Sequence, residues 1–326
     1  MRKLRRSSLQ LPTLAGSGKG ARAAADDATK KQADSSARLS FKGREHWREP
    51  DVIGALHSRH GHVCAYCGCG LADKEKGDVE HFRPKGKVTN APEHGGYWWL
   101  AFSFRNYLVS CWHCNQVIKG NHFPLRPRGK RRTASNWSWG NEDVRWLLHP
   151  EDDVEQWMVI DWRDPLCEIQ PRDGIPVTAR QQVVWTRDFF RLNEEPAIGS
   201  RVRTKERVDE ALKTERFSEV QTAACRYQPH SLFVRQMLSE VRPELIPDEE
   251  FELKWMIKQT ANKLKRLAIQ LSRNGLSKAE KALAKEYLWT LAALWKEPPV
   301  GASSDVEALL GEFGLKSRVQ PLFDRL

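Results

Sequence analysis

The sequence predicts an α+β fold, in which a small core of two short strands and a helix precedes a mostly helical C-terminal extension. The core is predicted by two Cys-x-x-Cys pairs, Cys64/Cys67 and Cys111/Cys114, with short apolar runs between them. The extension is predicted by segments 251–271 and 277–295, where apolar residues recur at helical spacing among lysines and arginines.

Composition narrows the class of protein. The chain has 326 residues, 40% of them hydrophobic, which is enough for a real core. Its formal net charge of +11 favours a polyanionic partner, although histone-like and ribosomal proteins share this bias. The odd count of seven cysteines and the lack of an 18-residue apolar run predict a cytoplasmic protein with no membrane span. The basic first 20 residues lack the apolar run of an export signal.

Four regions are expected along the chain. Residues 1–40 are rich in Ala, Ser, Gly and Lys and predict a disordered basic tail. We expect the cysteine-containing domain at 41–135, a mixed α/β extension at 136–215 and a helical C-terminal region at 216–326.

The elements of the cysteine-containing domain follow from local patterns. Pro50 suits the first position of a helix, and Gly61 stops it. Residues 79–82 and 107–110 read as short strands. A further helix is expected to begin near the second cysteine pair, to carry Asn115 and Lys119, and to end at Gly120.

Later elements are predicted in the same way. Apolar alternation between 155 and 170 predicts two short strands joined by a turn. Ser277 and Glu280 match a capping box at the start of the helix at 277–295. The remaining expected helices are 178–192, 201–212, 251–271 and 306–313.

The two cysteine pairs predict a structural zinc site, because four thiolates in this spacing suit tetrahedral Zn²⁺. The 43 residues between the pairs exceed a simple zinc ribbon, so an insertion must loop out. That insertion contains Glu80, His81 and Asn106, and Asn115 follows the last cysteine directly. The alternative is a zinc ribbon with a purely structural role. His113 could replace a cysteine, but four thiolates suffice without it.

These polar residues suit metal-assisted hydrolysis. Glu80 offers a carboxylate oxygen and Asn115 a carbonyl oxygen, the donors preferred by Mg²⁺ or Mn²⁺. His81 offers a base whose ordinary pKa is about 6.5. On a strand, adjacent Glu80 and His81 point to opposite faces, so one can face the metal while the other faces the attacking water. Asn121 and His122 are alternative ligands.

The stretches VEHFRPK, RNYL and CWHCNQVIKGN resemble the motif of HNH endonucleases of the zinc-bound type. The resemblance implies a zinc-bound ββα-metal (HNH) core, with His81 as general base. It further implies that Glu80 and Asn115 hold the catalytic metal and that Asn106 braces the loop positioning His81. The chain departs from the family in having Glu80 where Asp is usual, Asn115 where His is frequent, and Tyr107 between Asn106 and Leu108.

A narrower resemblance extends over roughly 45–215. EHFRPK, CNQ, KGNHFPL, LLHPEDD and RLNEEPAIGSR look like the PtuB-like HNH proteins of bacterial Septu anti-phage systems. This similarity implies a defence nuclease with an ATPase partner. The PEDD stretch is interpreted as a solvated turn rather than a second metal site.

Basic residues around the motif predict contacts with nucleic-acid phosphates, which supply non-specific affinity. The candidate residues are Lys85, Lys119, Arg126, Arg128, Lys130, Arg131 and Arg132.

The sequence therefore predicts a metal-dependent HNH endonuclease that hydrolyses DNA phosphodiester bonds, with structural Zn²⁺ and catalytic Mg²⁺ or Mn²⁺. Two alternatives remain open. One is a zinc-stabilised nucleic-acid-binding adaptor without catalysis, in which His81 would be dispensable. The other is an HNH toxin that cleaves RNA or tRNA.

Overall fold

The computed structural model describes residues 40–43, 45–71, 77–138, 145–274, 276–296 and 306–325. The expected basic tail at 1–40 lies outside the described residues except for Ser40. Helices dominate the described chain, and they accompany two small antiparallel sheets of two strands each. None of the described helices is both long and apolar enough to cross a membrane.

The predicted core elements form as expected. Helix α2 (Pro50–His60) starts with its proline and ends at Gly61. Strand β1 (Asp78–His81) pairs antiparallel with β2 (Tyr107–Ser110), and the register places His81 opposite Tyr107. Short 3₁₀ turns flank these elements at His46–Arg48, Trp98–Leu100, Phe104–Asn106 and Ala134–Asn136.

The helix after the second cysteine pair, η4 (His113–Lys119), is wider than an α-helix. Its last turn closes through an i→i+5 hydrogen bond of 2.7 Å from the Gly120 amide to the Asn115 carbonyl. Such π-type turns are rare and occur frequently at functional sites. Gly120 ends the helix in the left-handed region, with φ at 46°.

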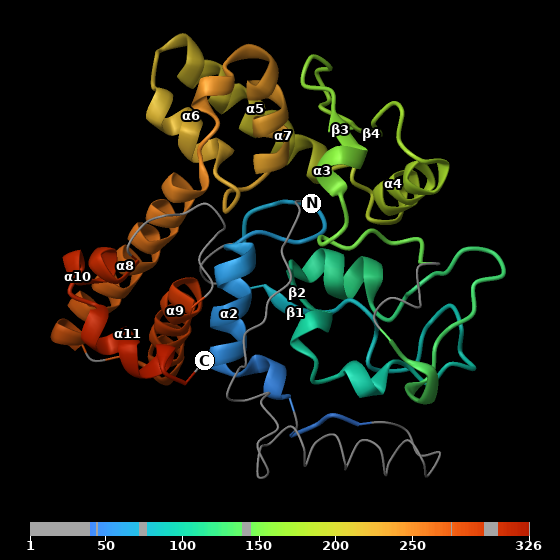
Figure 1. Cartoon of the computed structure of the whole chain (residues 1–326), viewed down its shortest axis with the longest axis horizontal. Coiled ribbons are helices and arrows are strands. Elements are labelled where there is room, and N and C mark those ends of the chain that lie inside the picture. Colours follow the sequence, from blue (N-terminus) through green and yellow to red (C-terminus); the bar gives the residue numbers. More distant parts are fainter. Residues whose placement is uncertain are drawn as a thin grey trace.

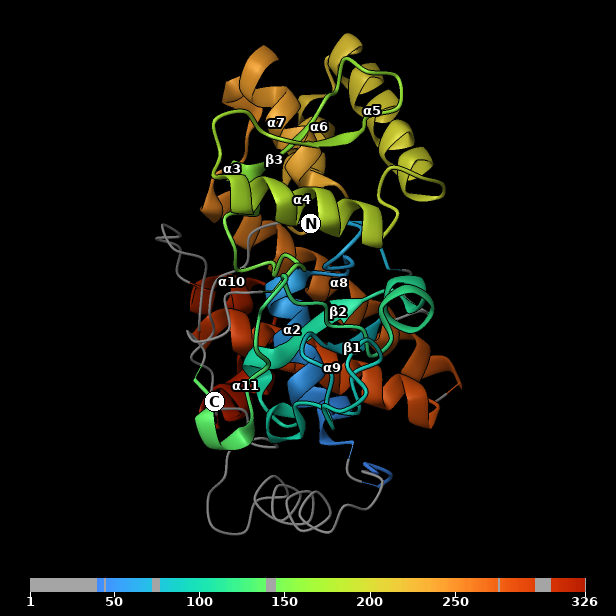
Figure 2. The ribbon, with the colours of Figure 1, turned by 90° about the vertical axis from the view of Figure 1, so that its right-hand side faces the viewer.

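The middle of the chain builds a second group of elements, at the top of Figures 1 and 2. Strands β3 (Met158–Ile160) and β4 (Ile169–Pro171) confirm the expected pair and follow the short helix α3 (Val154–Trp157). The helices that complete the group are α4 (Val177–Phe189), α5 (Ala197–Lys213), α6 (Phe217–Ala224) and α7 (Ser231–Val241).

The C-terminal helices return to the core. Past the 3₁₀ turn Pro243–Leu245, the long helix α8 (Glu249–Asn274) leads to α9 (Lys278–Lys296), α10 (Val306–Glu312) and α11 (Lys316–Phe323). The capping box is confirmed, because the Glu280 amide bonds Ser277 Oγ and the Ser277 amide bonds the Glu280 carboxylate. Figure 1 shows α9 alongside α2, with β1 and β2 on the other side of α2.

Buried apolar side chains form two clusters. The larger one joins the cysteine-containing domain to the middle segment. The smaller one lies among α8–α11 and includes Trp289 of α9 and Leu253 of α8. The expected domain boundaries at 135 and 215 remain predictions.

The contact between α2 and α9 depends on Gly54. A Cβ atom there would lie 2.5 Å from Trp289 Cβ and 2.7 Å from the Glu286 carbonyl oxygen. Backbone atoms of a packed helix cannot move aside without opening the interface.

We expect Gly54→Ala to lower the free energy of unfolding by about 1–3 kcal/mol, the usual cost of overpacking a core. Gly311→Ala is the matched control, because Gly311 also lies in a helix but has nothing within 4 Å of its would-be Cβ. It should be neutral or stabilise the chain by about 0.5–1 kcal/mol. Denaturant unfolding of both variants measures the difference, and equal stabilities would contradict the close packing.

Candidate active site

The four cysteines of the two pairs converge as predicted. The sulfur atoms of Cys64, Cys67, Cys111 and Cys114 all lie within 4.8 Å of one another, the one such group of metal-binding side chains among the described residues. Cys67 Sγ and Cys111 Sγ are 4.0 Å apart. Tetrahedral Zn–S bonds of about 2.3 Å require a separation near 3.8 Å. The group, here called the cysteine cluster, can therefore hold a metal such as zinc, and His113 is exposed outside it.

The four thiols are close enough to perturb one another. A side-chain hydrogen bond with Cys111 raises the pKa of Cys114, whereas hydrogen bonds with its neighbours lower the pKa of Cys111. A metal ion bound by all four sulfur atoms would hold them as thiolates. None of the seven cysteines, all of them among the described residues, forms a disulfide.

The cysteine cluster is joined to β1 through Tyr66, which lies inside the first pair. The Tyr66 hydroxyl donates to Glu80 Oε1 at 3.1 Å, and its ring stacks on Phe190 with centroids 4.2 Å apart. Glu80 is 3% exposed. Burial raises the pKa of this carboxyl, and the Lys119 ammonium and the Tyr66 hydroxyl oppose that shift.

His81 is held in one orientation by the strand and by the backbone. Its Nε2 lies 2.9 Å from the Ala101 carbonyl oxygen, which accepts a hydrogen bond from that nitrogen, so Nδ1 carries the lone pair and Lys85 Nζ lies 3.4 Å from it. Trp47 and Tyr107 pack edge-on to the ring, with centroids 4.8 and 4.9 Å away. Burial, followed by the charge of Lys85, holds the pKa of His81 well below its ordinary value. This shift favours the neutral form of the imidazole.

Asn106 does not border the polar pocket described below, and its side chain bonds backbone groups near His81. Its Oδ1 accepts from the Arg83 amide at 2.9 Å, and its Nδ2 donates to the Arg83 carbonyl at 2.9 Å. A third bond of 3.4 Å reaches the Leu100 carbonyl. The side chain thus ties the backbone just after His81 to the loop before β2, and its role as a brace stays a prediction.

A polar pocket of about 170 Å³ lies beside these residues. Both Glu80 and His81 border it, although they alternate along β1, and Asn115 borders it from η4. Asn121, the alternative ligand, also lies at its edge, whereas His122 is not among the lining residues. The volume is sufficient for a hydrated divalent ion, since a water molecule occupies about 30 Å³ of liquid.

The donors at this pocket fit Mg²⁺ or Mn²⁺. The Asn115 carbonyl oxygen and the second oxygen of Glu80 are hard ligands of the kind these ions prefer. Zinc would favour the sulfur ligands of the cysteine cluster instead. The two candidate metal positions are therefore separated by ligand chemistry.

Both lysines near the pocket were expected to contact nucleic-acid phosphates, and the structure contradicts this for one of them. Lys119 is fully buried, and its Nζ bonds Glu80 Oε1 at 2.5 Å and the His81 carbonyl at 3.2 Å. A side chain enclosed in this way cannot reach a phosphate, so the expected nucleic-acid contact is corrected to an internal ion pair. Lys85 does border the pocket, with its Nζ 3.4 Å from His81 Nδ1 and 4.6 Å from the Trp47 ring centroid. Burial lowers the pKa of Lys85 to about 8.

The basic loop at 126–132 presents its charges unevenly. Arg128 and Lys130 are exposed, whereas Arg126, Arg131 and Arg132 are half-buried. Arg131 bonds the Tyr97 hydroxyl at 3.4 Å, and the Arg126 guanidinium lies 5.9 Å from the Trp146 ring centroid. Arg128 and Lys130 are therefore the loop's most accessible candidates for contact with phosphates.

The sequence patterns did not identify several polar or aromatic residues at the pocket. Asp78 borders the pocket from β1, Gln116 borders it from η4, and Trp47 and Arg48 border it from the segment before α2. Strand alternation could have identified Asp78, since it lies two residues before Glu80. No sequence pattern indicates Trp47 or Arg48, because their contacts are long-range.

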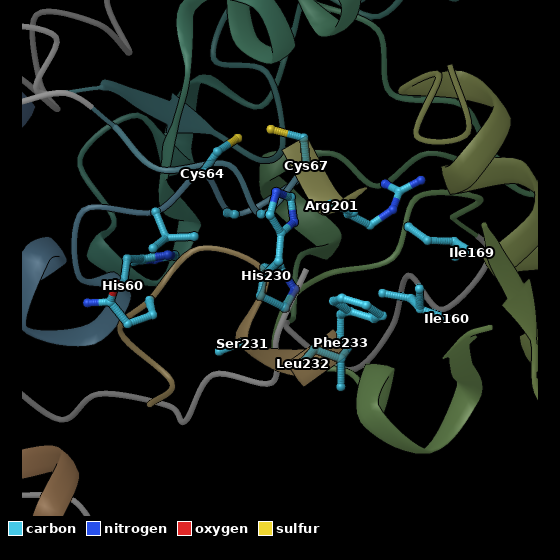
Figure 3. A pocket seen from close by; sticks show the side chains of 15 residues that line it. His60, Cys64, Cys67, Ile160, Ile169, Arg201, His230, Ser231, Leu232 and Phe233 are labelled. Atoms are coloured by element: carbon cyan, nitrogen blue, oxygen red, sulfur yellow. The ribbon is translucent and has the colours of Figure 1, made fainter. Parts of the chain in front are cut away.

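Behind the cysteine cluster lies a second, small cavity, shown in Figure 3. Its volume of about 30 Å³ holds only one or two water molecules. Cys64 and Cys67 line it from the core, Arg201 lines it from α5, and His230 lines it from the start of α7. The His230 amide donates to the Gly68 carbonyl at 3.0 Å. The cavity marks a tight interface between the cysteine cluster and the middle helices.

The fold and site define a mixed helix-and-sheet protein with a cluster of four cysteines that could hold a metal ion such as zinc, next to a polar pocket bordered by a buried histidine. The chain is similar to a curated protein, the Septu protein PtuB of Bacillus mycoides (strain KBAB4), with 34% identity over 117 residues. The match covers 34% of the chain and 39% of the relative. No family model matches the chain.

Proposed function

We propose that the chain is a metal-dependent HNH-type endonuclease that hydrolyses DNA phosphodiester bonds in an anti-phage defence system of the Septu kind. The observation that carries the proposal is the orientation of His81. Its Nε2 donates to the Ala101 carbonyl, and its Nδ1, which Lys85 Nζ approaches at 3.4 Å, is the ring nitrogen able to accept a proton beside a pocket bordered by Glu80 and Asn115.

The chain's own residues supply most of the chemistry. His81 Nδ1 would take a proton from the attacking water, and the lowered pKa of its ring keeps it neutral before the reaction. Lys85 would hold the phosphate from its place beside the base. Glu80 and Asn115 would bind Mg²⁺ or Mn²⁺, which, when bound, polarises the phosphate and stabilises developing charge. In the same proposal, the cysteine cluster holds Zn²⁺ and keeps Asn115 and Lys119 at their distances from β1.

Cleavage of DNA by the purified protein tests the proposal. Supercoiled plasmid should be nicked with Mg²⁺ or Mn²⁺ and stay intact with EDTA. An RNA substrate run in parallel distinguishes the RNA-cleaving alternative. Absence of cleavage of either substrate, with intact binding to DNA, would favour the non-catalytic adaptor.

The defence role and the ATPase partner rest on the similarity to the Septu protein PtuB. A gene for an ATPase next to the gene for this chain, and co-purification of the two products, would support that part of the proposal. If no ATPase gene lies nearby, the proposed ATPase partner is not supported, but the nuclease proposal is unaffected.

The exposed basic loop gives a quantitative prediction for DNA binding. We expect Arg128→Ala with Lys130→Ala to weaken binding equally for all duplex sequences and to reduce the slope of log affinity against log salt by about 2, because each phosphate contact contributes about 0.9. Fluorescence anisotropy across a salt series measures this slope. Lys258→Ala with Lys265→Ala, which removes two exposed charges from α8, is the matched control. An equal change in slope for both pairs would show that the loop has no special part in binding.

A further inference from the structure

Asp78 is the one acidic side chain at the polar pocket to which the proposed chemistry assigns no part. It lies on β1, two residues before Glu80, so the two carboxylates share a strand face. Its Oδ2 accepts a hydrogen bond from Asn115 Nδ2 at 3.2 Å and another from Gln116 Nε2 at 3.1 Å. Two consecutive residues of η4 are therefore anchored to one oxygen of β1.

This contact determines which end of the Asn115 amide meets the pocket. A carboxylate can only accept hydrogen bonds, so it selects the NH₂ group of Asn115 and repels the carbonyl oxygen. Asn115 is 7% exposed, and its Oδ1 is consequently turned away from Asp78. With the amide reversed, the NH₂ group would meet a cation and no ligand would remain.

We propose that Asp78 is a positioning residue for metal binding, which holds Asn115 with its carbonyl oxygen directed at the divalent ion. The inference rests on the proposed function, because it assigns Asn115 as a ligand. Partners that orient metal ligands typically affect metal affinity or activity by about 10–100-fold when they are removed. The charge of Asp78 adds attraction for the cation, so the experiment must separate orientation from charge.

The test measures Mn²⁺ affinity of the full zinc-loaded chain by electron paramagnetic resonance of free Mn²⁺, independently of cleavage. We expect Asp78→Ala to raise the Mn²⁺ dissociation constant by roughly 10–100-fold. Asp78→Asn should raise it less, because its Oδ1 still accepts from Asn115 Nδ2 although the charge is gone. Asp173→Ala, which removes an exposed carboxylate in the turn after β4, serves as the control and should bind like the wild type. Zinc content and thermal unfolding confirm that each variant is folded.

The decisive comparison is between Asp78→Ala and Asp78→Asn, since both remove the charge and only the asparagine keeps an acceptor for Asn115 Nδ2. Asp78→Asn should bind Mn²⁺ several-fold more tightly than Asp78→Ala if Asp78 acts by orienting the amide. Equal affinities of these two variants, or equal affinities of Asp78→Ala and the wild type, would overturn the positioning role. A wild-type chain that cleaves DNA but does not need Asp78 refutes this inference alone. A wild-type chain that neither binds Mn²⁺ nor cleaves DNA refutes the proposed function together with it.

Discussion

Replacing His81 by alanine or glutamine should lower the rate of metal-dependent DNA cleavage by roughly 10²–10⁴-fold, the usual contribution of a general base. Glutamine is the sharper test, because its side-chain amide can still donate to the Ala101 carbonyl that now binds His81 Nε2. It offers no acceptor of comparable basicity where Nδ1 lies. Initial rates of plasmid nicking with Mg²⁺ or Mn²⁺ measure the effect.

The His81 variants also lose ring contacts with Trp47 and Tyr107, so some loss of stability is expected with alanine. Zinc content and the melting temperature therefore accompany each rate. His113→Ala is the matched control, because this histidine is exposed and lies outside both the polar pocket and the cysteine cluster. Wild-type cleavage by His81→Gln would show that a group other than His81 activates the water.

Local patterns explain what the sequence could predict. The cysteine spacing, the proline and glycine around α2, and the Ser277–Glu280 capping box each encode a geometry within a few residues. Strands β1 and β2 were predictable for the same reason, since alternation depends only on neighbours. These signals place Glu80, His81 and Asn115 on their elements before any tertiary contact is known.

Lys119 illustrates what local patterns could not predict. A lysine after a nuclease-like motif suggests a phosphate contact, but its partners Glu80 and the His81 carbonyl lie far earlier in the chain. Whether a charged side chain is buried or exposed depends on such long-range contacts. Gly54 is a similar case, because the need for a glycine there arises only from its close contact with Trp289 of α9. Amphipathic spacing predicted α9 but not the surface it covers.

Removal of a cysteine ligand should have the largest effect on stability. We expect Cys114→Ala to lose the bound zinc and to lower the free energy of unfolding by roughly 5 kcal/mol or more, since structural zinc contributes on the order of 10 kcal/mol in small zinc domains. The melting temperature should fall by about 10 °C or more. Zinc content by mass spectrometry and thermal unfolding with and without a chelator measure both effects.

The consequence should extend beyond the cysteine cluster, because the cluster holds three parts of the molecule together. The Ala65 amide bonds the Val109 carbonyl of β2 at 2.8 Å, Tyr66 bonds Glu80, and the Gly68 carbonyl accepts from His230 of the middle helices. Cys114 is also the residue directly before Asn115. We therefore expect Cys114→Ala to lose cleavage although its side chain lies outside the polar pocket.

Cys225→Ala, which changes a fully buried cysteine outside the cluster, is the control. It should keep its zinc and its activity and lose only about 1 kcal/mol of stability. Retention of zinc by Cys114→Ala, or an equal loss of stability in both variants, would contradict a structural zinc at the cluster.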